Sequence, residues 1–176
     1  TVDSDTSTND TALLFASGKA APAGATIDVD TPELQEFTQA LIAVCEYLAR
    51  QMAADGEGAT KLVTVNVTGA ATDADADEVA RSIANSPLVK TALYGHDANW
   101  GRIAAAAGKT KAAFSQEHVD IARMGMPVCK QGLALDFDED EALRLFEEPE
   151  IVIDVDLGAG DCATTVWTCE FTHDYI

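Results

Sequence analysis

Residues 95–102 read Gly-His-Asp-Ala-Asn-Trp-Gly-Arg, a polar segment whose side chains could hold a charged ligand. The apolar spacing from Trp100 onward predicts a helix, and Asp97 is placed to cap its N-terminus. Because the free N–H groups at a helix start favour anions, Asn99 and Arg102 would stand beside a potential binding site. The alternative is structural: Asp97 caps, Trp100 packs in the core and Arg102 pairs with a carboxylate. The residues alone favour this second interpretation.

Thr1 opens the given sequence, and an N-terminal Thr can be a nucleophile whose own amino group acts as the base. The simpler interpretation is that the sequence as given happens to begin there. The next nine residues are rich in hydroxyl and carboxyl groups, which can satisfy one another or cap turns. An N-terminal-nucleophile hydrolase that uses Thr1 therefore stays an alternative hypothesis.

The signals for metals and cofactors are weak. Carboxylates occupy four positions of a calcium-binding loop, namely Asp136, Asp138, Asp140 and Glu147. Glu141 stands where that loop needs a Gly for its sharp turn. The histidines and cysteines show no metal-ligand spacing, and residues 158–161 lack the third Gly of a dinucleotide fingerprint. We therefore expect neither a metal site nor a bound cofactor.

The composition narrows the class of partner. The 176 residues contain 11 Lys and Arg against 30 Asp and Glu, which gives a net charge of −19. This balance argues against nucleic acid or an anionic membrane as the main partner and favours a cationic substrate or a cationic partner subunit. A non-catalytic acidic interaction module stays an alternative hypothesis. Free thiols at Cys45, Cys129, Cys162 and Cys169, with neither a leader nor a long apolar segment, predict a cytoplasmic protein.

Strands and helices alternate along the chain. The pattern predicts strands at residues 11–16, 62–67, 88–94, 119–123, 126–135, 151–157 and 162–171. It predicts a long helix after a Thr31 cap, a second at 72–85, a third from Trp100 and a fourth at 139–147. The last two strands are expected to form a hairpin across residues 158–161. The predicted fold class is α/β, with a mixed sheet packed against helices in layers.

Four blocks of sequence together resemble a known family. They are residues 3–11 (DSDTSTNDT), 55–61 (DGEGATK), 86–95 (SPLVKTALYG) and 97–102 (DANWGR). In order and spacing they resemble the β-chain of ornithine acetyltransferase, the bifunctional glutamate N-acetyltransferase of arginine biosynthesis. The chain departs at Ser4, where the family usually has Gly, and at Ala98, where it usually has Pro. Neither change removes a reactive group.

The resemblance implies a fold, a reaction and partners. Residues 1–69 would belong to the sandwich core of an N-terminal-nucleophile-like fold, and residues 70–176 would form a smaller C-terminal α/β domain. Acetyl would pass from N-acetylornithine to glutamate in a ping-pong reaction, and acetyl-CoA would be a second acyl donor in bifunctional members. The acyl-carrying Thr would come from self-cleavage at an Ala-Thr-Met-like sequence upstream of this chain, so no residue here is expected to be the nucleophile. An α-chain would complete a heterotetramer of two α and two β chains, and this chain alone would be inactive.

One substrate contact carries over from the family, at Glu57. A carboxylate between Gly56 and Gly58 lies where the backbone can approach a ligand closely, and it could bind the ammonium group of ornithine. Without the resemblance, a solvated loop after a helix end is the better interpretation. Lys61, with the residues of the 97–102 block, stays a candidate for a supporting or subunit-interface role.

Overall fold

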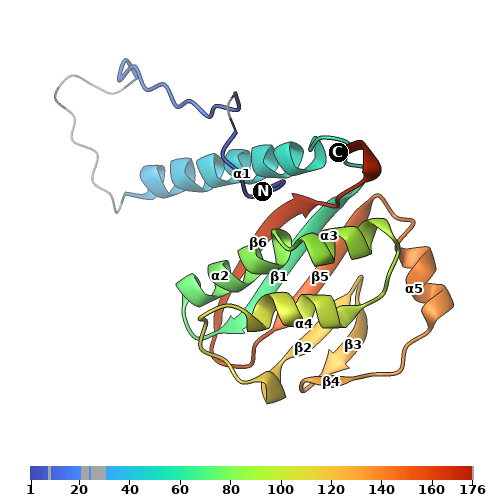
Figure 1. Cartoon of the computed structure of the whole chain (residues 1–176). Helices are drawn as coiled ribbons and strands as arrows, with labels where there is room; N and C mark the ends of the chain where they lie inside the picture. Colours follow the sequence, from blue (N-terminus) through green and yellow to red (C-terminus); the bar gives the residue numbers. More distant parts are fainter. Residues whose placement is uncertain (8, 21–23, 25–30, 176) are drawn as a thin grey trace. The chain divides into compact units, whose positions relative to one another are not determined.

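The computed structural model describes residues 1–7, 9–20, 24 and 31–175 (Figure 1). The chain divides into two compact units, one of residues 5–49 and one of residues 1–4 with 50–176. The larger unit contains the sheet described next. The division into domains at residues 69 and 70 stays a prediction, because it concerns the architecture of a longer protein.

A six-stranded mixed sheet organises the larger unit (Figure 1). Its strands are β1 (Leu62–Ala70), β2 (Asp120–Arg123), β3 (Met126–Lys130), β4 (Leu133–Ala134), β5 (Glu150–Asp156) and β6 (Cys162–Cys169). They lie in the order β4-β3-β2-β5-β1-β6, and only β1 and β5 are parallel. The predicted mixed α/β sheet is thus confirmed, with the 126–135 run divided into β3 and β4 by a turn at Gln131 and Gly132, both at positive φ.

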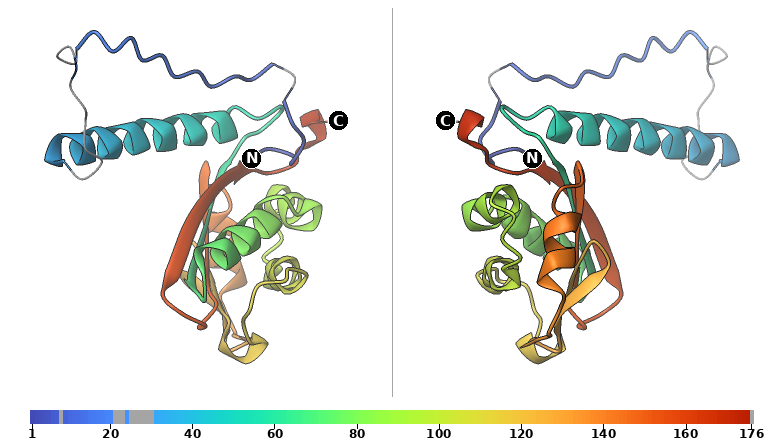
Figure 2. Two further views of the ribbon diagram at one scale, coloured as in Figure 1. Left: turned by 90° about the vertical axis from the view of Figure 1, so that its left-hand side faces the viewer. Right: turned by 90° about the vertical axis from the view of Figure 1, so that its right-hand side faces the viewer.

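The described residues form the helices α1 (Pro32–Ala54), α2 (Asp73–Ala84), α3 (Pro87–Tyr94), α4 (Trp100–Gly108) and α5 (Glu139–Leu145), with short 3₁₀ turns η1 (Gln116–His118) and η2 (His173–Tyr175). Helices of the larger unit cover one face of the sheet. Figure 2 shows α2, α3 and α4 on the same side of the strands. Along β1, Val63, Val65 and Val67 are buried in the core, and the alternate residues are more exposed. This alternation fixes which face of the sheet the helices cover.

The predicted caps of the two long helices are present. The Thr72 hydroxyl accepts the Asp75 N–H at 3.1 Å and donates to the Asp75 carboxylate at 2.9 Å, which starts α2. Thr31 accepts the Leu34 N–H at 3.4 Å at the start of α1. Each cap accepts a hydrogen bond from a backbone N–H of the first turn, which has no partner within the helix. The sequence therefore predicted these two helix starts correctly.

Residues 88–94 form a helix, so the predicted strand there is wrong. Ser86 accepts the Val89 N–H, and Pro87 occupies the first turn of α3. These are helix-start signals, and they outweigh the short apolar run that resembled a strand. Val89 and Leu93, four residues apart, are both buried, as expected of one helix face.

The predicted strand at residues 11–16 is also absent. These residues have no strand conformation, and the side chains of Leu13, Leu14 and Phe15 are exposed. An apolar run becomes a strand only when a neighbouring strand supplies hydrogen-bond partners. The described residues provide no such neighbour for this segment.

The predicted hairpin of β5 and β6 is wrong as well, because β1 lies between these two strands. The connecting loop passes around the end of β1, where Ala159 and Gly160 donate N–H groups to the Gly69 carbonyl at 2.7 and 2.9 Å. β1 is paired on both edges, with β5 on one side and β6 on the other, and its Val63, Val65 and Val67 are completely buried. Spacing in sequence could not reveal an intervening strand from 80 residues or so earlier in the chain.

Candidate functional site

The Glu57 loop, residues 55–61, joins α1 to β1 in the larger unit. The side chain of Glu57 is exposed, and the structure gives it no hydrogen bond or ion pair with any described residue. It lines neither of the two surface hollows found in the described part of the chain. The carboxylate is therefore available to a ligand, and its substrate role stays a prediction.

The backbone of the Glu57 loop is held tightly. Gly58 has a φ of +65°, and a Cβ there would lie 2.7 Å from the Asp174 carbonyl carbon and 2.8 Å from the Tyr175 nitrogen. The Thr172 hydroxyl donates a hydrogen bond of 2.7 Å to the Gly58 carbonyl. The segment after β6 thus presses against the loop directly beside Glu57, and only Gly fits at that position.

A Gly58→Ala substitution is expected to destabilise the full-length protein by about 1–3 kcal/mol, because Ala strains a positive φ and collides with backbone atoms. Gly108→Ala is the matched control. Gly108 ends α4 at an ordinary helical φ with open space around it, so Ala there is expected to be neutral or slightly stabilising. Urea unfolding measures both, and equal effects of the two substitutions would contradict the tight packing of the Glu57 loop.

A buried carboxylate anchors the other end of the Glu57 loop. Glu170 is only 1% exposed. Its Oε1 accepts hydrogen bonds from the N–H and the hydroxyl of Thr60, both at 2.7 Å, and its Oε2 accepts from the Lys61 N–H at 3.0 Å. Three donors from two successive residues fix the backbone where the loop enters β1. Glu170 therefore holds in place the loop on which Glu57 stands.

Lys90 is completely buried beside this anchor. Its ammonium group donates hydrogen bonds of 2.6 Å to the Thr168 hydroxyl and the Cys169 carbonyl and lies 4.8 Å from the centre of the Phe171 ring. Burial lowers the pKa of Lys90 from its ordinary 10.5, and Cys169, Glu170 and Asp3 oppose this shift. The buried ammonium thus ties α3 to the end of β6.

Lys90 is expected to leave a pH signature on stability. Between its lowered folded-state pKa and 10.5, the unfolded chain binds more protons, so this group makes the free energy of unfolding rise with pH in that window. Lys90→Met removes this contribution while keeping an unbranched apolar side chain. In urea unfolding from pH 7 to 10.5, the free energy of unfolding of the wild type should therefore rise relative to that of the variant as pH rises. A difference that is constant with pH would rule out the desolvated ammonium as its source.

The 97–102 block has a structural arrangement. Asn99, and not Asp97, occupies the N-cap position of α4, and its side chain makes no capping hydrogen bond, so the predicted Asp97 cap is wrong. The Asp97 carboxylate instead pairs with Arg102 at 3.5 Å, and Arg102 also donates to the Leu88 carbonyl at 2.8 Å. Trp100 packs against the core. An ion pair within the block replaces the helix cap, because α4 begins three residues after Asp97.

Lys61 also makes a structural contact. Its side chain is largely buried, and its ammonium group donates to the Glu148 carbonyl at 3.3 Å. Its backbone N–H is one of the three donors to Glu170. Lys61 therefore supports the Glu57 loop mainly through its backbone.

Comparison with known proteins places the chain in a family. Residues 1–176 match the ArgJ family over their whole length. The chain belongs to the ArgJ family. Two relatives are the proteins named arginine biosynthesis bifunctional protein ArgJ from Chlorobium chlorochromatii and Geobacillus stearothermophilus, which are 44% and 46% identical over 176 residues. The match covers all of this chain and 40% and 42% of those proteins.

A solved ArgJ structure has the same fold. The crystal structure of the bifunctional ArgJ protein from Bacillus halodurans matches with a TM-score of 0.91 and 46% identity, covering 99% of this chain and 82% of that chain. This confirms the resemblance that the four sequence blocks carry and the α/β fold class predicted from the alternation of strands and helices. The chain spans about two fifths of the length of the ArgJ relatives from Chlorobium and Geobacillus.

Sequence reasoning did not single out Lys90 or Glu170. Lys90 lies within an apolar run, Glu170 follows a strand, and neither belongs to a motif with recognisable chemistry. Charged residues are rarely buried, so their types alone pointed to the surface. The one available signal was a charged residue at a position that the apolar periodicity of the chain predicts to be buried.

Among the described residues, none of the helices has the length and apolar character that crossing a membrane requires.

Proposed function

We propose that this chain is part of the β-chain of an enzyme that transfers an acetyl group from N-acetylornithine to glutamate. The observation that carries the proposal is the whole-chain match to ArgJ proteins, which are named as bifunctional proteins of arginine biosynthesis. The Glu57 loop adds a physical reason. It offers an exposed carboxylate on a backbone that is fixed at both ends by Thr172 and Glu170.

In this proposal the chain binds substrate while the nucleophile comes from elsewhere in the protein. The Thr hydroxyl attacks the acetyl carbonyl of N-acetylornithine, the amide bond breaks, and ornithine leaves as the free amine. The amino group of glutamate then takes the acetyl group from the Thr ester, which restores the hydroxyl. Glu57 would hold the side-chain ammonium of the ornithine moiety by a charge-assisted hydrogen bond.

Acetyl-CoA would be a second acyl donor, which fits the word bifunctional in the names of the relatives. Its thioester would acylate the same Thr hydroxyl and release the free thiol of CoA. Neither half of this exchange requires a metal or a bound organic cofactor, since a hydroxyl and an amine trade the acetyl group directly. We propose the cytoplasm as the site of this chemistry.

The partner would be the α-chain of the same precursor, in an assembly of two α and two β chains. Large apolar side chains along α1 support a protein partner, because they are exposed in this chain: Phe37, Ile42, Val44, Tyr47, Leu48 and Met52. A contiguous apolar surface of this kind is typical of an interface.

Trapping the acetylated enzyme tests the proposal. The full-length protein is incubated with N-acetylornithine without glutamate, and mass spectrometry locates the acetyl group. We expect one acetyl ester on a Thr outside these 176 residues, lost when glutamate is added. An acetyl ester on Thr1, or none, would overturn the proposed mechanism. Purified residues 1–176 should show no transfer, because they lack the nucleophile.

A further inference from the structure

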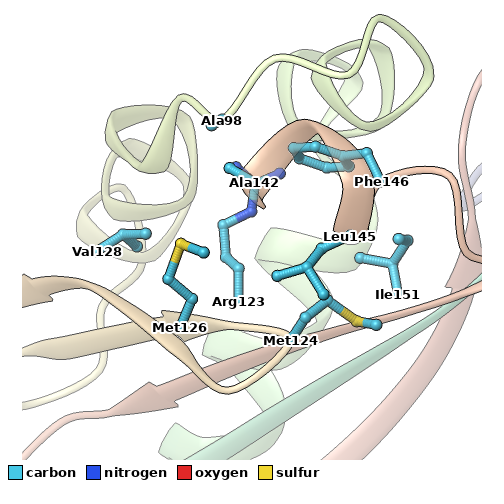
Figure 3. Close-up of a pocket in the computed structure, with 9 residues that line it drawn as sticks. All are labelled: Ala98, Arg123, Met124, Met126, Val128, Ala142, Leu145, Phe146 and Ile151. Carbon is cyan, nitrogen blue, oxygen red and sulfur yellow. The ribbon is translucent and has the colours of Figure 1, made fainter. Parts of the chain in front are cut away.

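The surface of this chain has fewer positive charges than its composition indicates. Three of the 11 Lys and Arg residues, namely Lys61, Lys90 and Arg123, are buried. Figure 3 shows the Arg123 side chain among apolar side chains, pointing toward the Phe146 ring. Among the described residues, Glu170 is the one buried carboxylate. In the described part of the chain, the ratio of carboxylates to cations is therefore higher at the surface than overall.

Ion pairs neutralise only a minority of the carboxylates. The chain has 30 side-chain carboxylates and 11 cations, so most carboxylates cannot have a cation of their own. Five ion pairs join described residues, and all of them are at least partly exposed. Their cations are Arg50, Arg81, Arg102, Lys130 and Arg144. Exposed pairs of this kind contribute little to stability, and salt screens them. The negative charge of the surface therefore remains largely unbalanced.

Residues 136–150 show this imbalance within one segment. They contain eight carboxylates and a single cation, Arg144, which pairs with Glu141. Asp136, Glu139 and Asp140 are exposed, and no ion pair joins them to a described residue. The start of α5 favours negative charge through the helix dipole, so the helix itself gains from carboxylates there. The cost of these residues is the repulsion among neighbouring carboxylates.

Like charges also meet on the sheet face that points away from the buried valines of β1. Asp120 of β2 lies directly opposite Asp156 of β5 in the antiparallel register. Asp154 is two residues from Asp156 on the same face, and all three carboxylates line one surface hollow. Lys130 pairs with Asp120 and is the one cation that lines this hollow. Like charges directly opposite each other on neighbouring strands destabilise a sheet.

Dissolved salt decides how much this repulsion costs. Charges held on a folded surface repel one another more strongly than charges on an expanded chain, so a large net charge lowers the free energy of unfolding. The screening length is about 10 Å at 0.1 M salt and about 3 Å at 1 M. At molar salt, only charges in direct contact therefore still interact strongly. The net charge of −19 is then far less costly to the folded state.

We propose that this chain is adapted to concentrated salt, and that its native state is stable only where salt screens the surface carboxylates. Without that screening, the carboxylates of residues 136–150 and of the open sheet face repel one another and weaken the fold. Screening acts on all of these charges together, so it requires no bound cation and does not distinguish K⁺ from Na⁺. This dependence on salt does not involve Glu57 or the acetyl-transfer reaction.

Thermal unfolding of the full-length protein, followed by circular dichroism, tests the proposal. We expect the Tm to rise by about 10–20 °C between about 0.05 and about 2 M KCl, and equally in NaCl. Chloride salts are used because sulfate strengthens apolar burial in proteins generally. A Tm that is constant or falls with KCl would overturn the proposal. A rise in KCl without one in NaCl would indicate a bound K⁺ ion and would overturn it as well.

A variant with fewer charges separates screening from a general effect of salt. Asp136→Asn, Glu139→Gln and Asp140→Asn, combined, remove three exposed charges. The Tm should rise by about 3–6 °C at about 0.05 M KCl and by about 1 °C or less at about 2 M. Weaker interaction with the helix dipole would lower the Tm, so the sign of the change identifies its source. No gain at low salt, or a gain that persists at high salt, would contradict the proposal.

Lys109→Gln is the matched control of opposite sign. Lys109 is exposed and forms no ion pair with a described residue, so its loss makes the net charge more negative without breaking a pair. We expect the Tm of this variant to fall below that of the wild type at low salt and to equal it at high salt. If Lys109→Gln raises the Tm at low salt, net charge does not govern the stability of this chain and the proposal is wrong.

Discussion

A Glu57→Gln variant of the complete enzyme is expected to have a KM for N-acetylornithine about 10- to 100-fold above that of the wild type. The reason is the loss of a hydrogen bond between a carboxylate and an ammonium, a type worth about 1.5–3 kcal/mol. Gln keeps the shape of Glu and removes only its charge, and the exposed position requires no repacking. Steady-state kinetics with varied N-acetylornithine measures the effect.

Asp55→Asn is the matched control for this prediction, because Asp55 is an exposed carboxylate only two residues earlier in the same loop. It should leave KM within about twofold of the wild type, as expected for a surface charge that makes no substrate contact. If both variants raise KM equally, the effect comes from the general negative charge of the loop. If neither does, Glu57 has no part in binding ornithine-type substrates.

A Glu170→Ala variant is expected to lose about 3–5 kcal/mol of unfolding free energy, because it removes a buried charged acceptor from the Thr60 N–H and hydroxyl and leaves the buried Lys61 N–H without a partner. The same change frees the Glu57 loop, so KM for N-acetylornithine should rise more than kcat falls. Glu170→Gln should restore only part of the lost unfolding free energy, because its amide nitrogen would face an N–H donor where Glu offers an oxygen.

Urea unfolding and the split between KM and kcat test the role of Glu170 together. Glu150→Ala serves as the control, because that carboxylate is 60% exposed and paired with Arg50 on the surface, where such pairs contribute about 1 kcal/mol or less. A Glu170→Ala protein as stable as Glu150→Ala would show that the buried hydrogen bonds do not anchor the loop. A loss of stability without a change in KM would limit Glu170 to a purely structural role.

Much of the fold follows from local signals in the sequence. Thr31 and Thr72 marked helix starts through caps that need only neighbouring residues, and the valines of β1 marked a strand by their alternation. The strand predicted at residues 88–94 is a helix because a short apolar run fits a strand and a buried helix face equally well, and the Ser86-Pro87 helix start decides between them. The pairing of β1 with both β5 and β6 depends on contacts between distant parts of the chain, which no local pattern contains.

The candidate site also contains some residues that local sequence signals predict and others that they do not. Glu57 was predictable because two glycines flank it and because the block around it resembles a family motif. Glu170 was not, since burial turns an ordinary surface residue into an anchor, and burial is a property of the assembled fold. The Asp97 cap failed for a simpler reason: α4 begins at Trp100, as its apolar spacing predicted, so the N-cap position falls on Asn99 and Asp97 lies two residues too early.

Because β1 pairs on both edges with strands from later in the chain, its pairing must wait until those strands have been synthesised. As the chain leaves the ribosome, this strand of alternating valines emerges well before residues 150–169, which pair with both of its edges. Until then its N–H and carbonyl groups are open to other nascent chains, which makes the interval a period of risk for aggregation. A ribosome that stalls between residues 71 and 149 would leave a product that cannot complete its own sheet and depends on chaperones to stay unaggregated.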